Sequence, residues 1–185
     1  MTAPGFDPGA TLVGPKLTVR KLVSADLDGL HAAASDPEIW AGHPATTRWQ
    51  REVFEPYFRM LIDLGGAVAV EDRSEGRIVG ASRFYVAPDQ RDAISIGFTF
   101  LDRTHWGGVA NFEMKSLMLT HAFAHFGEVW FHIAPSNIRS QKATAKLGAV
   151  HAYDARLDLA GTPTDWQCFR LAKADWEAVL AGRAA

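Results

Sequence analysis

Apolar and polar residues alternate with the two-residue period of β-strands in several short stretches of the chain. The segments that follow this pattern are residues 17–23, 66–72, 77–87, 92–101, 129–134, 150–159 and 164–172. The short links RSEG and PDQR connect the second segment to the third and the third to the fourth. Because links this short join strands that run in opposite directions, the pattern predicts antiparallel hairpins there.

Between these segments, apolar residues recur every three or four positions, which is the spacing of one helix face. The first predicted helix covers residues 24–35, and the second covers residues 47–64, where the glycine pair at 65–66 stops it. Further helices are expected at residues 109–125, 136–148 and 174–181. The apolar stripe of the second helix consists of Val53, Phe54, Tyr57, Phe58 and Leu61.

The order of these elements predicts an α+β fold on one mixed, mostly antiparallel, twisted sheet. A predicted helix connects the strands at 92–101 and 129–134, and a crossover of this kind joins parallel strands. Residues 1–15, which are rich in glycine and proline, are expected to form an irregular lead-in. Residues 16–182 are expected to form a single domain.

Composition excludes several classes of function. The chain of 185 residues has a formal net charge of −2 and no block of like charges, which argues against a nucleic-acid partner. No segment has the length and apolar character of a membrane span or a signal peptide, so a cytoplasmic protein is expected. Cys168 is the single cysteine, which excludes an internal disulfide and a multi-cysteine zinc site. His121 and His125 have the spacing of a metal-binding pair but lack a third ligand, so no metal site is predicted.

A glycine pair stands between the strand at 92–101 and the helix at 109–125, in the sequence HWGGVANFEMK. The first backbone N–H groups of a helix have no partner within the helix, and the helix dipole makes that end attractive to anions. Glycines would let those N–H groups approach a phosphate closely. A plain strand-to-helix turn is the competing interpretation. Gly97, inside the preceding strand, is expected to mark a bulge or a close backbone approach.

A second motif, NIRSQKATAKLG, begins about thirty residues later and also follows a predicted strand. The glycine loop at 106–110, Glu113 after it, and the second motif together resemble the cofactor motifs of the GNAT N-acetyltransferase superfamily. The resemblance is greatest to the branch that includes the ribosomal-protein N-terminal (alanine/serine) acetyltransferases. It covers residues 16–175, and the positions that carry the second motif are Asn137, Ser140, Lys146 and Gly148.

This resemblance implies the acyl-CoA N-acyltransferase fold, with helices on both faces of the sheet and a parallel strand pair that splays at the cofactor site. It implies acetyl-CoA as cosubstrate and direct transfer of the acetyl group, in a ternary complex, to a primary amine. The acceptor would be a protein N-terminus or a small amine, and a homodimer is expected. The residues expected to bind the cofactor are Phe98, Thr99, Phe100, Trp106, Gly107, Gly108, Val109, Ala110, Asn111, Asn137, Ser140 and Lys146.

Two departures from the family pattern concern catalysis. Val109 replaces the second glycine of the usual loop, and Thr144 stands where many members carry a tyrosine proton donor. Ser140 is therefore the leading candidate for the group that protonates the leaving thiolate, with Asn137 or water as alternatives. A non-catalytic module that binds or senses acyl-CoA is the alternative function, and a pure interaction protein is a third.

The remaining candidates depend on where their side chains lie. Cys168 is expected to be a small core residue of the last strand. The acceptor side is expected to involve Trp40, His43, Trp49 and Tyr57, although these aromatic side chains could equally belong to the core. Candidates for the base, each of which could also be an ordinary surface charge, are Glu71, Asp72, Asp102 and His105.

Overall fold

The computed structural model describes residues 3–184, and contacts within the chain divide these residues into two units. The larger unit comprises residues 7–84 and 98–121. The smaller unit comprises residues 3–6, 85–97 and 122–184. Strands β4 (Arg77–Ala87) and β5 (Gln90–Leu101) each begin in one unit and end in the other, and each unit is described by itself below.

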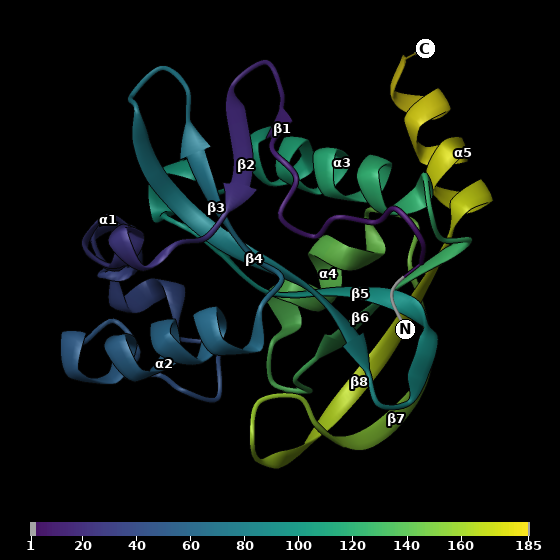
Figure 1. Cartoon of the computed structure of the whole chain (residues 1–185). Helices are drawn as coiled ribbons and strands as arrows, with labels where there is room; N and C mark the ends of the chain where they lie inside the picture. Colours follow the sequence, from purple (N-terminus) through teal and green to yellow (C-terminus); the bar gives the residue numbers. More distant parts are fainter. Residues whose placement is uncertain (1–2, 185) are drawn as a thin grey trace. The chain divides into compact units, whose positions relative to one another are not determined.

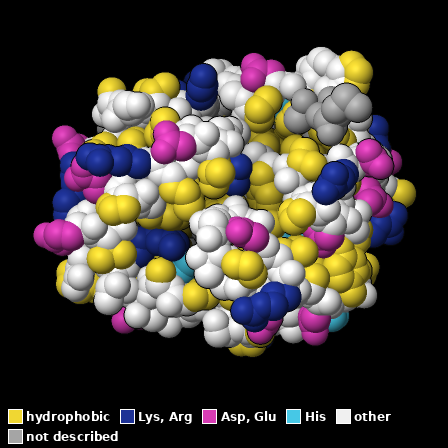
Figure 2. All heavy atoms as spheres, turned by 60° about the horizontal axis from the view of Figure 1, so that its bottom comes forward, with side chains coloured by type: hydrophobic (Ala, Val, Ile, Leu, Met, Phe, Trp, Pro, Cys, Tyr) yellow, Lys and Arg dark blue, Asp and Glu magenta, His cyan; other side chains and the backbone are white. Residues whose placement is uncertain are grey.

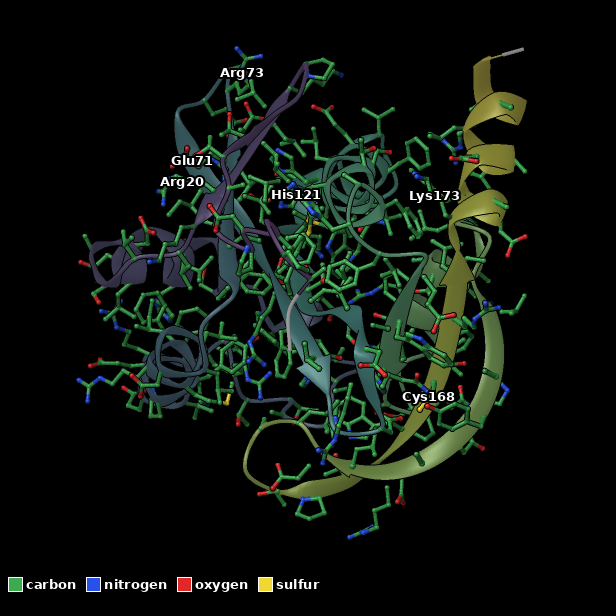
Figure 3. The ribbon with its side chains drawn as sticks, turned by 45° about the vertical axis from the view of Figure 1, so that its right-hand side comes forward. Arg20, Glu71, Arg73, His121, Cys168 and Lys173 are labelled. Carbon is green, nitrogen blue, oxygen red and sulfur yellow. The ribbon has the colours of Figure 1, made fainter. Side chains whose placement is uncertain are left out.

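The larger unit contains an antiparallel meander and two neighbouring helices. Its elements are β1 (Leu12–Val13), β2 (Leu17–Lys21), α1 (Leu27–Ala34), α2 (Arg51–Leu64), β3 (Ala67–Asp72), most of α3 (Ala110–Phe123) and parts of β4 and β5. β2 pairs with β1 and with β3, and β3 pairs with β4, all antiparallel. Figure 1 shows α1 and α2 side by side. Arg20 on β2 and Glu71 on β3 point toward each other and form an ion pair (Figure 3).

The starts of the first two helices differ from the prediction. A 3-10 turn at Ser24–Asp26 precedes α1, and the Asp26 carboxylate caps it by accepting the Val23 N–H at 2.9 Å. α2 begins at Arg51, because the backbone of Gln50 is extended and residues 43–50 form successive turns. In addition, the stretch expected to be irregular contains β1.

The apolar stripe of α2 forms much of the core of the larger unit. Four of the five predicted residues are buried, with exposed fractions from 0 to 8%. They pack with α1 and with Phe100 at the end of β5. Burial of side chains of this size stabilises a fold by about 1.5–3 kcal/mol each, so this stripe fixes the position of α2. The four residues are Phe54, Tyr57, Phe58 and Leu61.

One ammonium group lies in this interior. Lys115 on α3 is buried, at 6% exposure, between positions that face the core, since Met114, Met118 and Leu119 are fully buried. Its Nζ donates to the Thr99 hydroxyl at 2.9 Å. Burial disfavours the charged form and lowers the pKa of Lys115 to about 7.

The smaller unit is built around a parallel strand pair and a long hairpin. It contains β6 (Glu128–Ile133), α4 (Ile138–Ala145), β7 (Val150–Asp158), β8 (Pro163–Ala172) and α5 (Lys173–Ala184). β5 pairs with β6 in parallel, as predicted, through Ile94 with Val129 and Ser95 with Trp130. β8 pairs antiparallel with β6 and with β7, and the β7–β8 hairpin is visible in Figure 1.

The hydrogen-bonded order of the eight strands is β1-β2-β3-β4-β5-β6-β8-β7. The prediction of an α+β fold with one mixed, mostly antiparallel sheet is therefore confirmed. On the face seen in Figure 2, positive and negative side chains are interspersed with apolar ones, without a large basic area. Among the residues described, no helix combines the length and the apolar character needed to cross a bilayer.

Gly66→Ala is expected to destabilise the protein more than Gly65→Ala. Both glycines have a positive φ, so each alanine costs about 1–3 kcal/mol in backbone strain. A Cβ at Gly66 would also lie 2.2 Å from the Phe84 carbonyl oxygen, whereas nothing lies within 4 Å of one at Gly65. Urea unfolding of both variants measures the difference, and equal losses would contradict it.

Lys115→Met is expected to change the pH dependence of stability. An unfolded lysine keeps its proton up to pH about 10.4, whereas native Lys115 releases it near pH 7. Between these values the unfolded state binds more protons, so raising the pH stabilises the wild type relative to the variant. The gain is at most about 1.4 kcal/mol per pH unit.

Urea unfolding at pH 7, 8 and 9 measures this effect. Lys142→Met, which replaces an exposed lysine of α4, is the control and should follow the wild type. The same pH slope for Lys115→Met and the wild type would contradict burial of the ammonium group.

Candidate active site

The end of β5 has a backbone conformation that few residues other than glycine adopt. Phe98 has a φ of 53°, and no other described non-glycine residue has a positive φ. Strain of this kind costs about 1–3 kcal/mol and is concentrated at functional sites. The irregularity thus lies at the first of the three residues, 98–100, that are predicted to bind the pantetheine arm.

Gly97, one residue earlier, shows the second of its two predicted features, a close backbone approach. A Cβ on Gly97 would lie 3.0 Å from the ring of Tyr85 and 3.1 Å from its hydroxyl. The parallel register with β6 ends shortly before, at Ser95 opposite Trp130. A side chain at this position would therefore press against the Tyr85 ring, and the left-handed backbone belongs to the next residue.

The loop from Gly107 to the first turn of α3 presents a row of free backbone donors. In the described part of the chain, the N–H groups of residues 107–111 donate no backbone hydrogen bond. Gly107 has a φ of 68°, and no atom lies within 4 Å of a Cβ built on Gly107 or Gly108. Val109 is 59% exposed, and its carbonyl accepts the Glu113 N–H. The valine therefore leaves the donors accessible at the start of a 14-residue helix.

Two contacts hold this loop in place. The Trp106 indole N–H donates to the Leu101 carbonyl at 2.9 Å, and its ring packs against the core of the larger unit. The Glu113 carboxylate accepts the N–H groups of Lys16 and Leu17 at 2.8 and 2.9 Å. Glu113 therefore fastens α3 to the start of β2.

Three of the candidate bases, Asp72, Asp102 and His105, form one ion-pair network next to the loop. His105 Nδ1 lies 2.5 Å from Asp102 and its Nε2 lies 3.1 Å from Asp72, while Arg77 and Thr104 also donate to Asp102. Burial disfavours the charged forms, but these hydrogen bonds outweigh it, lowering the pKa of Asp102 and raising that of His105. The network anchors the loop, and its members are already paired with one another.

In the smaller unit, Asn137 caps α4. Its side-chain oxygen accepts the Ser140 N–H at 3.1 Å, so the spacing of the two motif residues is that of a helix cap. The Asn137 amide N–H₂ and the Ser140 hydroxyl both lie on partly buried residues at the start of the helix. This geometry leaves each residue one polar group for a ligand.

The end of α4 carries the other motif positions. Thr144, at the position where many family members have tyrosine, is buried at 6% exposure, and Lys146 is exposed. Gly148 has a φ of 90°, and a Cβ there would lie 3.2 Å from Val179 and 3.5 Å from Leu171. The glycine of the motif is thus explained by the chain reversal after the helix and by the packing around it.

The aromatic residues predicted on the acceptor side are found in the larger unit and are mostly core residues. Trp40 and Tyr57 are buried, and Trp49 packs against the same core. The edge of the His43 ring meets Trp40, with 5.5 Å between ring centroids. Burial and the nearby charge of Arg48 lower the pKa of His43 to about 4, so this imidazole is neutral at pH 7.

A second group of polar side chains lies inside the smaller unit. Single ligand atoms of Asp89, His132 and Cys168 lie within 4.8 Å of one another, a donor set that could hold a divalent ion such as Zn²⁺. Tyr153 donates to Asp89 at 2.6 Å, and the Tyr85 hydroxyl lies 2.9 Å from His132 Nδ1. Cys168 lies on β8 (Figure 3) and is fully buried, as predicted.

Each unit therefore holds part of the predicted site. The larger unit contains residues 98–100, the loop at 106–111 and the four acceptor candidates, and the smaller unit contains Asn137, Ser140 and Lys146. Sequence reasoning missed Arg48, and it did not foresee the burial of Lys115. Lys115 falls on the apolar stripe of α3, three and four residues before Met118 and Leu119, and this spacing could have identified it. The surroundings of Arg48 come from separate segments, so no local pattern reveals them.

Several solved structures have a similar fold. A GCN5-related N-acetyltransferase from Brucella melitensis is 19% identical, with a TM-score of 0.81 over 100% of this chain and 88% of that one. RimJ from Mycobacterium smegmatis, in complex with CoA-disulfide, is 16% identical, with a TM-score of 0.67 over 99% and 98% of the two chains. A spermidine N-acetyltransferase SpeG chimera from Vibrio cholerae and hSSAT is 16% identical, with a TM-score of 0.60 over 88% and 99%.

No curated protein sequence is significantly similar to this chain. A family model described as an acetyltransferase (GNAT) domain, however, matches residues 16–150. That range includes the free donors at 107–111, the left-handed Phe98 and the Asn137–Ser140 cap. Because this family model matches most of the sequence, the protein belongs to the GNAT acetyltransferase family, as its two motifs predicted.

Proposed function

We propose that the protein transfers an acetyl group from acetyl-CoA to the primary amine of a small molecule or a protein N-terminus. The observation that carries this proposal is the row of free N–H groups at residues 107–111, at the positive end of α3 and without side chains in the way. Such a row suits a pyrophosphate, which accepts several hydrogen bonds at once. The family to which the chain belongs acts with acetyl-CoA on amines in general.

The proposed roles follow the chemistry of each group. The amides of residues 107–111 bind the pyrophosphate, and the strand edge at 98–100 binds the pantetheine arm by main-chain pairing. The Trp106 N–H, also expected to bind the cofactor, already donates to the Arg103 carbonyl at 3.2 Å. Lys146 offers a charge to the cofactor phosphates. When bound, acetyl-CoA supplies an activated acetyl group as a thioester.

The acceptor must reach the thioester as a neutral amine. Its nitrogen forms a bond to the carbonyl carbon, the bond from that carbon to sulfur breaks, and the nitrogen gives up one proton. An α-amine has a pKa near 8, so a water relay suffices as base, and the paired carboxylates of Asp72 and Asp102 are not needed. The Ser140 hydroxyl donates a proton to the leaving sulfur and recovers one from solvent, while the Asn137 amide orients the reacting groups.

Transfer is direct in this proposal, without an acetylated protein intermediate. The chain has a single cysteine, Cys168, and this thiol is fully buried in β8 with 0% exposure. Burial lowers the reactivity of this thiol, because it raises the pKa of Cys168 to about 11. A ternary complex of protein, acetyl-CoA and amine is therefore the simplest route.

A non-catalytic acyl-CoA sensor is the second candidate, because Thr144 is buried and cannot supply the proton that a tyrosine would. Melting temperature with and without acetyl-CoA, followed by thiol release with a panel of amines, distinguishes the two. A ligand at 100 times its dissociation constant stabilises the native state by about 2.7 kcal/mol. A shift without release from any amine would favour the sensor, and no shift would refute both.

Gly108→Asp is expected to weaken acetyl-CoA binding more than tenfold. The new carboxylate would stand beside the pyrophosphate, and the repulsion of like charges at this range costs more than about 1.4 kcal/mol. The open space around Gly108 lets the variant fold normally.

Calorimetric titration with acetyl-CoA measures the change. Gly127→Asp is the matched control, because Gly127 is also exposed with nothing within 4 Å of its Cβ position. Unchanged affinity in Gly108→Asp would place the phosphates elsewhere.

Ser140→Ala is expected to lower kcat about tenfold or more, because general acid catalysis typically contributes about 10²–10⁴-fold and water replaces part of it. The thermal shift with acetyl-CoA should stay intact. Ser136→Ala removes an exposed hydroxyl from the same turn and should retain full turnover. Steady-state thiol release gives both rates. A loss below about threefold would assign the proton donor to water.

A further inference from the structure

Arg48 lies in the turns before α2, against two buried aromatic rings. Its guanidinium carbon is 3.9 Å from the centroid of Tyr57 and 5.1 Å from that of Trp40. The side chain is half-buried, and burial lowers the pKa of its guanidinium. The rings hold the charged plane in one place through cation–π contact.

Among the described residues, this arginine has no counter-ion. No carboxylate of those residues lies within 4.0 Å of its guanidinium, whereas three other arginines of the larger unit have one. Partial burial of an unpaired cation costs free energy that a bound anion would offset. The paired arginines are Arg20 with Asp26, Arg51 with Asp28 and Arg103 with Asp36.

The side chain that meets the Arg48 guanidinium, His43, presents a donor to it. The Ala45 N–H donates to His43 Nδ1 at 3.1 Å, which places the proton of the neutral imidazole on Nε2. His43 Nε2 lies 3.4 Å from Arg48 Nη1. Two N–H donors therefore converge, and an acceptor oxygen between them would satisfy both.

This donor pair adjoins the strand end to which the pantetheine arm is assigned above. The Trp40 ring, which contacts both His43 and Arg48, also lies against Phe100 with 5.2 Å between centroids. The phosphates of the cofactor already have the free amides at 107–111. An oxygen ligand at Arg48 is therefore best supplied by the acceptor.

We propose that Arg48 and His43 bind a carboxylate of the acceptor, so that the substrate is an amine that also carries a carboxylate, such as an amino acid. This proposal rests on the acetyltransferase function proposed above. A guanidinium binds a carboxylate through two parallel hydrogen bonds, and the aromatic rings exclude water from one side.

The test compares L-amino acids with the corresponding amino acid amides as acceptors, in the wild type and in Arg48→Met. The wild type should prefer the carboxylate by tenfold or more in kcat/KM, and Arg48→Met should reduce this preference at least tenfold. The two α-amines of a pair differ in pKa, but that difference cancels when the ratio is compared between proteins.

Two further variants serve as controls. Arg51→Met removes an arginine that already pairs with Asp28, and it should keep the wild-type preference. Arg48→Lys retains the charge without the planar fork and should give an intermediate preference, and it replaces Arg48→Met if that variant does not fold.

The outcomes separate the two proposals. An equal preference in Arg48→Met and the wild type would overturn the carboxylate site while leaving acetyl transfer intact. Weaker acetyl-CoA binding in Arg48→Met, with the preference for the carboxylate unchanged, would assign the arginine to a cofactor phosphate. That result would also overturn the carboxylate site.

If no amine is acetylated, the acetyltransferase proposal fails, and binding decides the carboxylate site. Ligand-observed NMR then measures binding of the same amino acids and amides. Binding of the amino acids alone, with loss of that binding in Arg48→Met, would support the carboxylate site. Equal binding of both sets, or no binding, would overturn it.

Discussion

The free N–H groups at residues 107–111 are the constraint around which the larger unit is organised. A helix cannot satisfy its own first donors, so the chain must either cap them or leave them for a ligand. Among the described residues no group caps these donors, and the neighbouring contacts hold the loop in place. The Trp106 indole holds its start, the Glu113 carboxylate fixes the first turn of α3 to β2, and the Asp102 network lies beneath. None of these contacts uses the donors themselves.

Much of the fold followed from local pattern. Strands with alternating polarity and the α2 stripe depend on neighbours in sequence, and they were found within a few residues of their predicted positions. The helix start at 47 was wrong, because the turns at 43–50 form bonds that propensity does not reveal. The helix expected from 24 does begin there, but its first turn is a 3-10 turn capped by Asp26. The cofactor loop was accessible to sequence reasoning because its glycines and helix start are contiguous. Gly97 was expected to mark a bulge or a close backbone approach, and the left-handed backbone of Phe98 beside it was not expected. The contact of Gly97 with Tyr85 depends on another strand, so local sequence does not reveal it.

The residues that sequence reasoning missed are cations in partly or fully buried positions. Removing a cation from water costs free energy, and Lys115 and Arg48 offset that cost in different ways. The lysine can lose its proton and becomes neutral near physiological pH, which makes its burial tolerable. A guanidinium cannot do so, and it relies on aromatic faces. The helical spacing of Lys115 to Met118 and Leu119 is visible in the sequence. The contacts of Arg48 come from separate segments, so its surroundings needed the three-dimensional arrangement.

The buried position of Cys168 has a practical consequence for work with this protein. As the chain holds one cysteine, and that thiol lies inside β8, a thiol-reactive dye added to the native protein reports thiols released in solution rather than the protein's own. The same dye becomes a conformational reporter once β8 separates from β6 and β7, its hydrogen-bonded neighbours. Labelling kinetics under native conditions would thus follow the opening of one strand, at a single site and without an introduced probe.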